Sequence, residues 1–124
     1  MAQHKASCSC GQLSLVYNGE IIKTSVCHCF ECQKRTGSVF GVQTRLEKKK
    51  TVLQGQSKVF RRTGDEGSEI SFHFCPVCGT TVYWEAAWLK ESIIATIGSF
   101  CDPTLPAPTM QVYTNRKHHW VCLP

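Results

Sequence analysis

The sequence predicts a small domain built almost wholly of β-strands. Three observations favour this class: short runs that alternate apolar and polar residues, turn signals between those runs, and only short helical candidates. The chain has 124 residues, enough for one hydrophobic core, so we expect a single domain over residues 1–124. Apolar residues make up 42% and charged residues 19% of the chain, a composition typical of globular proteins and not of disordered ones.

The expected strands follow one another along the chain. The first is "QLSLVY" (12–17), which alternates and ends in Asn18-Gly19, a dipeptide typical of tight turns. The segment "TGDEG" separates two further strands at 57–62 and 69–74, and this arrangement predicts a hairpin. The remaining strands are expected at 39–44, 51–54, 80–84, 93–97 and 110–114.

Helices are expected to be few and short. One candidate is the turn after Cys29 through Arg35, and a second is "EAAWLKE" (85–91). No segment approaches the roughly 20 apolar residues of a membrane span, and the start "MAQHKASCSCG" lacks the apolar stretch of a signal peptide. We therefore expect a cytoplasmic protein without a membrane partner.

Cysteine is the most informative residue type. Nine cysteines are an odd number, and in a reducing compartment such a density indicates metal binding rather than disulfides. Seven of the nine fall into three groups at ligand spacing: Cys8 and Cys10; Cys27, Cys29 and Cys32; Cys75 and Cys78.

The two cysteine pairs together predict one closed site. In an extended segment, Cys8 and Cys10 would present both sulfurs on one face. "CPVCG" has the spacing of a zinc knuckle, in which Gly79 lets the backbone curl around the sulfurs. Four thiolates are typical of structural zinc, whose binding contributes folding free energy. Spacing alone leaves open a pairing of Cys8 and Cys10 with the second group, and unliganded buried thiols are the less favoured alternative.

The triplet Cys27, Cys29 and Cys32 offers three ligands within six residues. Three protein ligands and one open position are what a catalytic zinc site requires. His28 is expected to point away from the face that Cys27 and Cys29 share. The alternative is a closed site, in which Cys101, Cys122 or a histidine supplies the fourth ligand, and the residue pattern leaves this choice open.

Several segments together resemble one known family. They are "CSCG", "CHCFECQKRTGS", "FHFCPVCGTTVYW", "IATIGSFCDP" and "VYTNRKHHW", and they run almost from end to end. In these segments the chain resembles the glutathione-dependent formaldehyde-activating enzymes, a family that also includes centromere protein V. The departure is length, because the formaldehyde-activating members are considerably longer and have more substrate-enclosing sequence.

The resemblance implies a fold, two metal sites and a reaction. The implied fold is a zinc-pinned β-tent of short antiparallel strands. The implied cofactors are two zinc ions per chain, one structural on Cys8, Cys10, Cys75 and Cys78, and one catalytic on Cys27, Cys29 and Cys32. The implied activity is that of a carbon–sulfur lyase, which condenses formaldehyde with the small-molecule thiol glutathione to S-hydroxymethylglutathione.

Glutathione carries carboxylates, so polar and basic residues beside the triplet are candidate ligand-binding groups. Gln33, Lys34 and Arg35 follow Cys32 directly and are our first candidates. More distant candidates are Arg45, Arg61 and Arg62. The competing interpretation is that the charges are solvated surface groups and that Gln33 serves the turn.

A rival hypothesis is a non-enzymatic zinc module that binds a thiol ligand, a protein or a nucleic acid. Its contacts would be "EKKK" (47–50) and "NRKHH" (115–119). The formal charge of +5 falls to about +2 when seven thiolates and two Zn²⁺ ions add −7 and +4, so we do not expect a nucleic-acid partner. The three tryptophans fit either a core or an interface, which leaves a homo-oligomer open.

Overall fold

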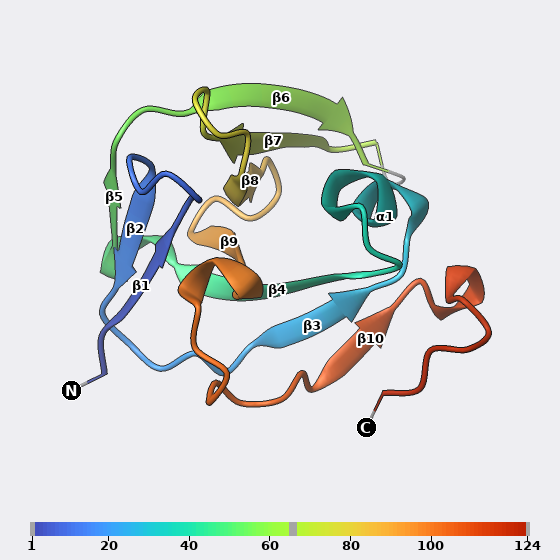
Figure 1. Cartoon of the computed structure of the whole chain (residues 1–124). Coiled ribbons are helices and arrows are strands. Elements are labelled where there is room, and N and C mark those ends of the chain that lie inside the picture. The colour runs from blue at the N-terminus through green and yellow to red at the C-terminus, as the bar shows by residue number, and fades with distance from the viewer. Residues whose placement is uncertain (1, 65–66, 124) are drawn as a thin grey trace.

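The computed structural model describes residues 2–64 and 67–123, and strands dominate this part of the chain (Figure 1). The strands are β1 (His4–Ser7), β2 (Ser14–Tyr17), β3 (Thr24–Cys27), β4 (Gly41–Glu47), β5 (Thr51–Gln54), β6 (Lys58–Thr63), β7 (Glu69–Phe74), β8 (Thr81–Ala86), β9 (Ser92–Thr96) and β10 (Met110–Val112). The helices are α1 (Phe30–Thr36) and three short 3-10 turns, η1 (Lys48–Lys50), η2 (Ile97–Phe100) and η3 (Thr114–Arg116). The predicted mainly β class is confirmed.

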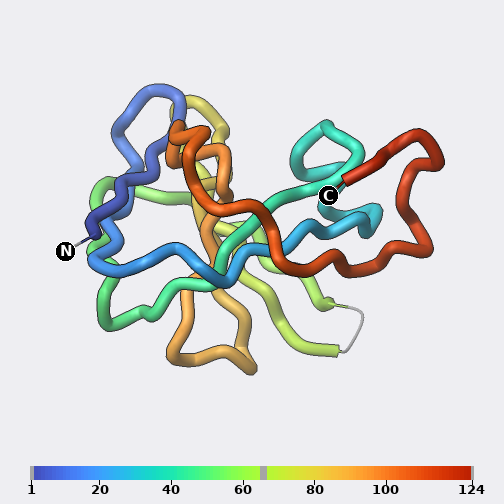
Figure 2. Tube along the Cα trace, turned by 90° about the horizontal axis from the view of Figure 1, so that it is seen from below, coloured from blue at the N-terminus to red at the C-terminus, as the bar shows by residue number. Residues whose placement is uncertain are grey.

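The strands form two sheets. The smaller sheet has the order β1-β2-β5, and the larger has the order β10-β3-β4-β9-β8-β7-β6. Neighbouring strands are antiparallel, as expected, except for β10, which pairs with β3 in parallel. The segment that ends in β10 thereby returns to the strand that leads into the cysteine triplet, and the C-terminal tail continues beside α1 (Figure 2).

The main hydrophobic core lies between the two sheets. Leu15 of β2 faces Leu46 of β4 and Ile93 of β9 within one buried cluster, and each of these side chains is at most 1% exposed. Side chains alternate between the two faces of a strand, and this places Leu46, Ile93 and Ala95 together on the core-facing side of the larger sheet. Burial of each leucine or isoleucine contributes about 1.5–3 kcal/mol to the stability of the fold.

The opposite face of the larger sheet carries a different set of side chains. Cross-strand partners share a face, and the register places Trp84 opposite both Phe72 and Ile94. The same alternation puts Cys27 opposite Gly41 on this face. One face of the larger sheet therefore borders the main core, and the opposite face carries Cys27 of the cysteine triplet.

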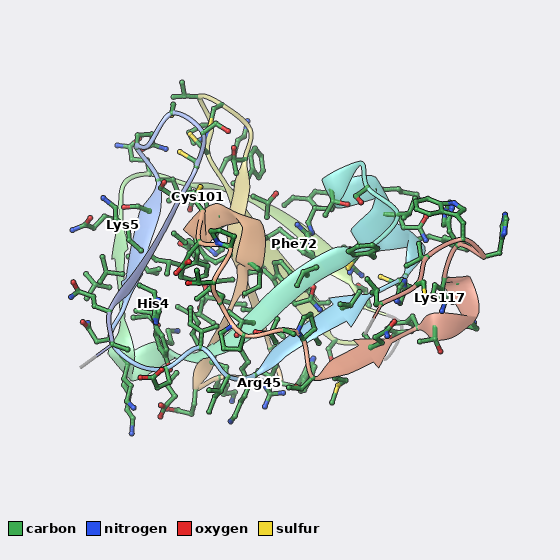
Figure 3. The ribbon with its side chains drawn as sticks, turned by 60° about the horizontal axis from the view of Figure 1, so that its bottom comes forward. His4, Lys5, Arg45, Phe72, Cys101 and Lys117 are labelled. Carbon is green, nitrogen blue, oxygen red and sulfur yellow. The ribbon has the colours of Figure 1, made fainter. Side chains whose placement is uncertain are left out.

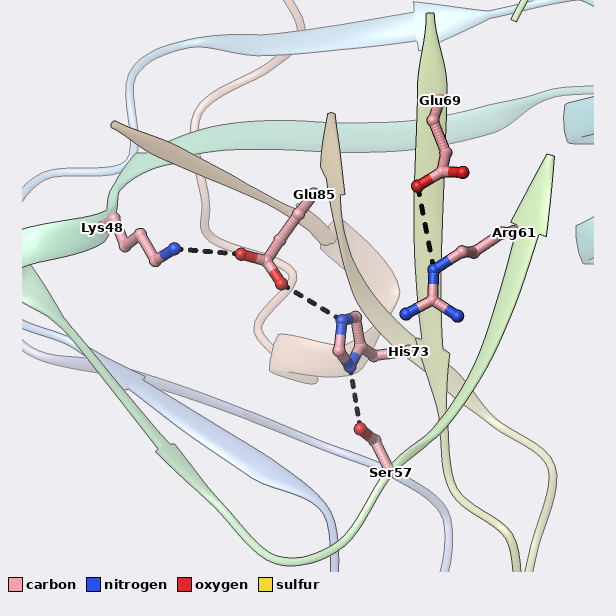
Figure 4. Close-up of polar contacts among 6 residues, drawn as sticks. All are labelled: Lys48, Ser57, Arg61, Glu69, His73 and Glu85. Atoms are coloured by element: carbon pink, nitrogen blue, oxygen red, sulfur yellow. Dashed lines mark hydrogen bonds and ion pairs between the residues drawn. The ribbon is translucent and has the colours of Figure 1, made fainter. Parts of the chain in front are cut away.

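A polar cluster lies on the core-facing side of β7 and β8 (Figure 4). His73 Nε2 lies 3.1 Å from Glu85 Oε1, and Ser57 Oγ lies 2.8 Å from His73 Nδ1. Lys48 Nζ approaches the other Glu85 oxygen at 3.1 Å. Tyr83 stacks on the His73 ring with 4.5 Å between centroids, and burial raises the pKa of this tyrosine.

Some expected element boundaries differ from the structure. The predicted helix at 85–91 is wrong, because Glu85 and Ala86 end β8 and a turn follows. The Ala87 amide donates to the Glu69 carbonyl, so strand pairing extends past the expected helix start. Strands β1 and β3, of four residues each, were not among the expected strands. Among the described residues, no helix combines the length and the apolar character that a membrane crossing needs.

Candidate metal centres and the adjoining cavity

The first candidate metal centre joins the two sheets. The sulfurs of Cys8, Cys10, Cys75 and Cys78 all lie within 4.8 Å of one another. The Cys8–Cys10 and Cys10–Cys75 sulfur pairs are 3.6 and 3.7 Å apart. A tetrahedral ion with Zn–S bonds of about 2.3 Å separates its sulfurs by about 3.8 Å. The spacing of these thiols therefore fits one tetrahedral ion.

Two tight turns present these sulfurs. After β7 the amides of Val77 and Cys78 donate to Cys75 Sγ at 3.3 and 3.5 Å, and Gly79 follows with φ of 81°. After β1 the Leu13 amide donates to Cys8 Sγ at 3.3 Å. Amides aimed at sulfur stabilise thiolates, which are the form that binds metal.

The structure corrects one detail of the expected first pair. Cys8 follows β1 and Cys10 lies in a turn, so the segment is not extended. The Gly11 amide donates to the Cys8 carbonyl at 3.0 Å, and Gly11 has φ of 86°. The turn, rather than strand alternation, brings the two sulfurs together. The alternative pairing with Cys27 and Cys29 is also wrong, because Cys8 and Cys10 meet Cys75 and Cys78.

The second candidate metal centre lies where β3 passes into α1. The Cys27, Cys29 and Cys32 sulfurs lie within 4.8 Å of one another, and all three residues are buried. Cys29 caps the N-terminus of α1, where its sulfur accepts a hydrogen bond from the Cys32 amide at 3.3 Å. Gly37 ends the helix in the left-handed conformation, with φ of 73°. The short capped helix therefore turns Cys32 back toward the other two sulfurs.

Within residues 2–64 and 67–123, no fourth ligand completes this group. His28 points away, as expected, and its Nε2 lies 2.8 Å from Gln111 Oε1. Cys101 is exposed and lies beside η2, on the half of the molecule that carries β1 (Figure 3). Cys122 is also exposed and belongs to neither group. Of the two alternatives, the geometry favours the open triplet.

Arg35 lies against this centre. Its guanidinium stacks over the Trp84 ring at 4.7 Å, and its buried Nε and Nη2 atoms have no oxygen or nitrogen partner among the described residues. A Cβ at Gly41 would lie 2.9 Å from Arg35 Nη2 and 3.7 Å from Cys32 Sγ, so the absent side chain leaves room for the guanidinium beside the sulfur. Hydrogen bonds from Cys27 and Cys29, and the charge of Arg35, lower the pKa of Cys32 to about 6.

The other two expected ligand-binding residues lie elsewhere. Gln33 donates to the His28 carbonyl at 2.9 Å and lies 3.0 Å from His118 Nε2, so it ties the C-terminal tail to α1. Lys34 is exposed and pairs with Glu31 at 3.2 Å. Neither side chain, nor that of Arg35, is among the described residues that line the cavity.

A cavity of about 590 Å³ opens beside the triplet, and Cys27, Cys29 and Cys32 form part of its lining. Of the basic candidates, Arg45 and Arg62 line it, and Lys23 and Arg116 of the 115–119 cluster join them. Arg61 does not, because it lies on the opposite face of β6, with its Nε 3.8 Å from a Glu69 oxygen (Figure 4). The apolar part of the lining, which includes Ile70, Trp84, Leu89 and Ile94, was not expected at this site. Alternation within each strand predicts which face each of the strand residues lies on, but only the register between strands brings them together beside the triplet.

Comparisons with known proteins agree with this arrangement. The sequence model of the family described as glutathione-dependent formaldehyde-activating enzyme matches residues 3–116. The chain belongs to this family. A crystal structure of a Rhodobacter sphaeroides protein superposes with a TM-score of 0.60 at 13% identity and covers 86% of this chain and 98% of that one. It shows a shared fold. No curated protein matches the chain.

Proposed function

We propose that the chain is a zinc-dependent carbon–sulfur lyase that acts on a thiol adduct, with glutathione and formaldehyde as the reactants that its family indicates. One observation carries the proposal: three buried cysteines with converging sulfurs line a cavity and have no fourth ligand among the described residues. The product of the condensation would be S-hydroxymethylglutathione. Nine free cysteines fit a reducing compartment, and we propose a cytoplasmic location.

The two cysteine groups suit different roles. Cys8, Cys10, Cys75 and Cys78 would hold a structural zinc ion, because four thiolates leave no position for a substrate. Cys27, Cys29 and Cys32 would hold a second ion, and thiolate ligands favour zinc over harder cations. When bound there, the ion would keep an incoming thiol in its nucleophilic thiolate form.

Residues of this chain then position the reactants. Arg45 and Arg62 have no carboxylate within ion-pair distance among the described residues, and both face the cavity. They would bind the carboxylates of glutathione, for which the planar arginine fork is suited. Arg35 would offset the negative charge that three thiolates concentrate at the other end of the site.

The reaction needs no oxidant. The thiolate sulfur attacks the formaldehyde carbon and forms the carbon–sulfur bond, while the carbonyl electron pair moves to oxygen, which takes a proton from water. In the reverse direction the hydroxyl proton leaves, the carbonyl forms and the electron pair of the carbon–sulfur bond returns to sulfur.

The test combines metal content with a thiol titration. Freshly purified protein should contain two zinc ions per chain, and X-ray absorption at the zinc edge should show added sulfur as glutathione is titrated. Cys29→Ser should abolish both that change and formaldehyde turnover. An unchanging sulfur shell at full zinc content would contradict an open site and favour the binding module.

A further inference from the structure

We propose that the carbonyl partner handled by this site is an aldehyde with a bulky apolar group, and not formaldehyde alone. The inference rests on the proposed function, since a thiol must first be held at Cys27, Cys29 and Cys32. It is carried by a separate feature, the apolar wall of the cavity.

Three neighbouring strands and one loop form this wall. Trp84 packs against Phe72 with 5.2 Å between ring centroids, and Ile94 completes the buried group. Ile70 and Leu89 are partly buried and pack on it. The cavity that the three cysteines of the triplet line is also lined by Trp84, Ile94, Ile70 and Leu89. A thiol adduct held at the triplet would therefore lie beside an apolar surface.

Neither reactant of the family reaction matches this wall. Formaldehyde contributes one carbon and one oxygen to the adduct. Glutathione is built from γ-glutamate, cysteine and glycine and has no apolar side chain. Ile70 and Leu89 are only partly buried, and both reactants would leave their exposed apolar surface against water, which is unfavourable. An alkyl chain or an aromatic ring on the aldehyde carbon would cover them, and a cavity of about 590 Å³ has the size of a small-molecule site.

Basic side chains border this apolar wall on both sides. Arg45 of β4 stands opposite Ile94, and Arg62 of β6 stands opposite Ile70 with its guanidinium 5.1 Å from the centre of the Phe72 ring. Ala86 is 7% exposed, stands opposite Ile70 on β7 and lines the same cavity. Its small side chain leaves space among larger neighbours, so the apolar wall continues to the end of β8.

The chemistry is unchanged by a larger aldehyde. In the cleavage direction the hydroxyl proton of the thiohemiacetal leaves, the carbonyl bond forms, and the electron pair of the carbon–sulfur bond passes to sulfur. The products are the thiol and the aldehyde, with no change in oxidation state.

A homologous series of aldehydes tests this inference. Zinc-loaded protein would be assayed with glutathione and propanal, butanal, pentanal or hexanal, whose carbonyl reactivities are closely alike. Each added methylene should raise kcat/KM about fourfold if it is buried, and hexanal should exceed propanal about 60-fold. Ala86→Leu should lower the hexanal-to-propanal ratio at least tenfold. Ala87→Leu is the matched control, because Ala87 is exposed and lies outside the lining.

The outcomes separate the two proposals. If glutathione sulfur enters the zinc shell and kcat/KM does not change along the series, the apolar-aldehyde inference is overturned while the proposed function stands. If no sulfur enters and no aldehyde reacts, both are overturned. Should the Ala86→Leu protein fail to fold, the wild-type series still decides the matter by its slope.

Discussion

Replacing one cysteine in each candidate metal centre should have unequal effects on stability. Cys75→Ser removes a ligand from the centre that joins the β1–β2 turn to the β7–β8 turn, and Cys29→Ser removes one from the triplet. Both side chains are buried, at 0% and 8% exposure, so the exchange of sulfur for oxygen is similar in each case. The difference between the two variants therefore reports what the metal link contributes.

The size of that difference follows from the chain between the ligands. Cys10 and Cys75 are 65 residues apart, and a cross-link that closes such a loop contributes about 4 kcal/mol through the entropy of the unfolded chain. Loss of the link should lower the Tm by roughly 15 °C in a domain of this size. The triplet spans six residues and constrains the unfolded chain little, so Cys29→Ser should lower the Tm by at most about 4 °C.

Differential scanning calorimetry of both variants measures these shifts, with zinc content determined on the same samples. The Cys75→Ser variant should have a Tm well below that of the Cys29→Ser variant, and each variant should hold one zinc ion per chain. Equal Tm losses at equal zinc loss would refute the division into a structural and a catalytic centre.

Three further predictions concern single side chains. Gly41→Ala should displace Arg35 and weaken zinc binding at the triplet about tenfold in a chelator competition, whereas Gly98→Ala, whose Cβ meets nothing within 4 Å, should not. Burial raises the pKa of Tyr83, so the folded state holds the phenol proton more tightly than the unfolded state. The free energy of unfolding measured in urea should therefore fall as the pH rises above about 10. The Tyr83→Phe variant, which has no phenol proton, should show a smaller fall. Leu46→Ala, at a side chain only 1% exposed, should lower the free energy of unfolding in urea by about 3 kcal/mol and leave zinc content at two per chain; a loss below about 1 kcal/mol would contradict the core assignment.

Much of the fold was predictable because alternation is a local property. The strands expected at 51–54, 57–62 and 69–74 match β5, β6 and β7 to within one residue at each end. The error at 85–91 arose because alanine, leucine and charged residues favour a helix locally, while the backbone there continues the β8 ladder and then turns. Strand pairing outweighs so short a helical preference.

Of the candidate site, only the cysteine ligands could be predicted from the sequence. Cysteine spacing marks Cys27, Cys29 and Cys32 as one group, because neighbours in the chain cannot be far apart in space. Nothing local indicates that Arg62 faces the cavity while Arg61 faces Glu69, since that depends on the register between β6 and β7. Gln33 and Lys34 were expected at the ligand from their nearness to Cys32, but helix α1 turns them toward the tail and the solvent.

The sequence by itself determined the ligand chemistry, the strand periodicity and the family. These depend on residue type and on spacing over a few residues. Only the tertiary structure decided that Cys8 and Cys10 meet Cys75 and Cys78, that the triplet has no fourth ligand among the described residues, and that an apolar wall stands beside it. Those facts are set by contacts between strands far apart in the chain, and such contacts follow from the packing of the two sheets.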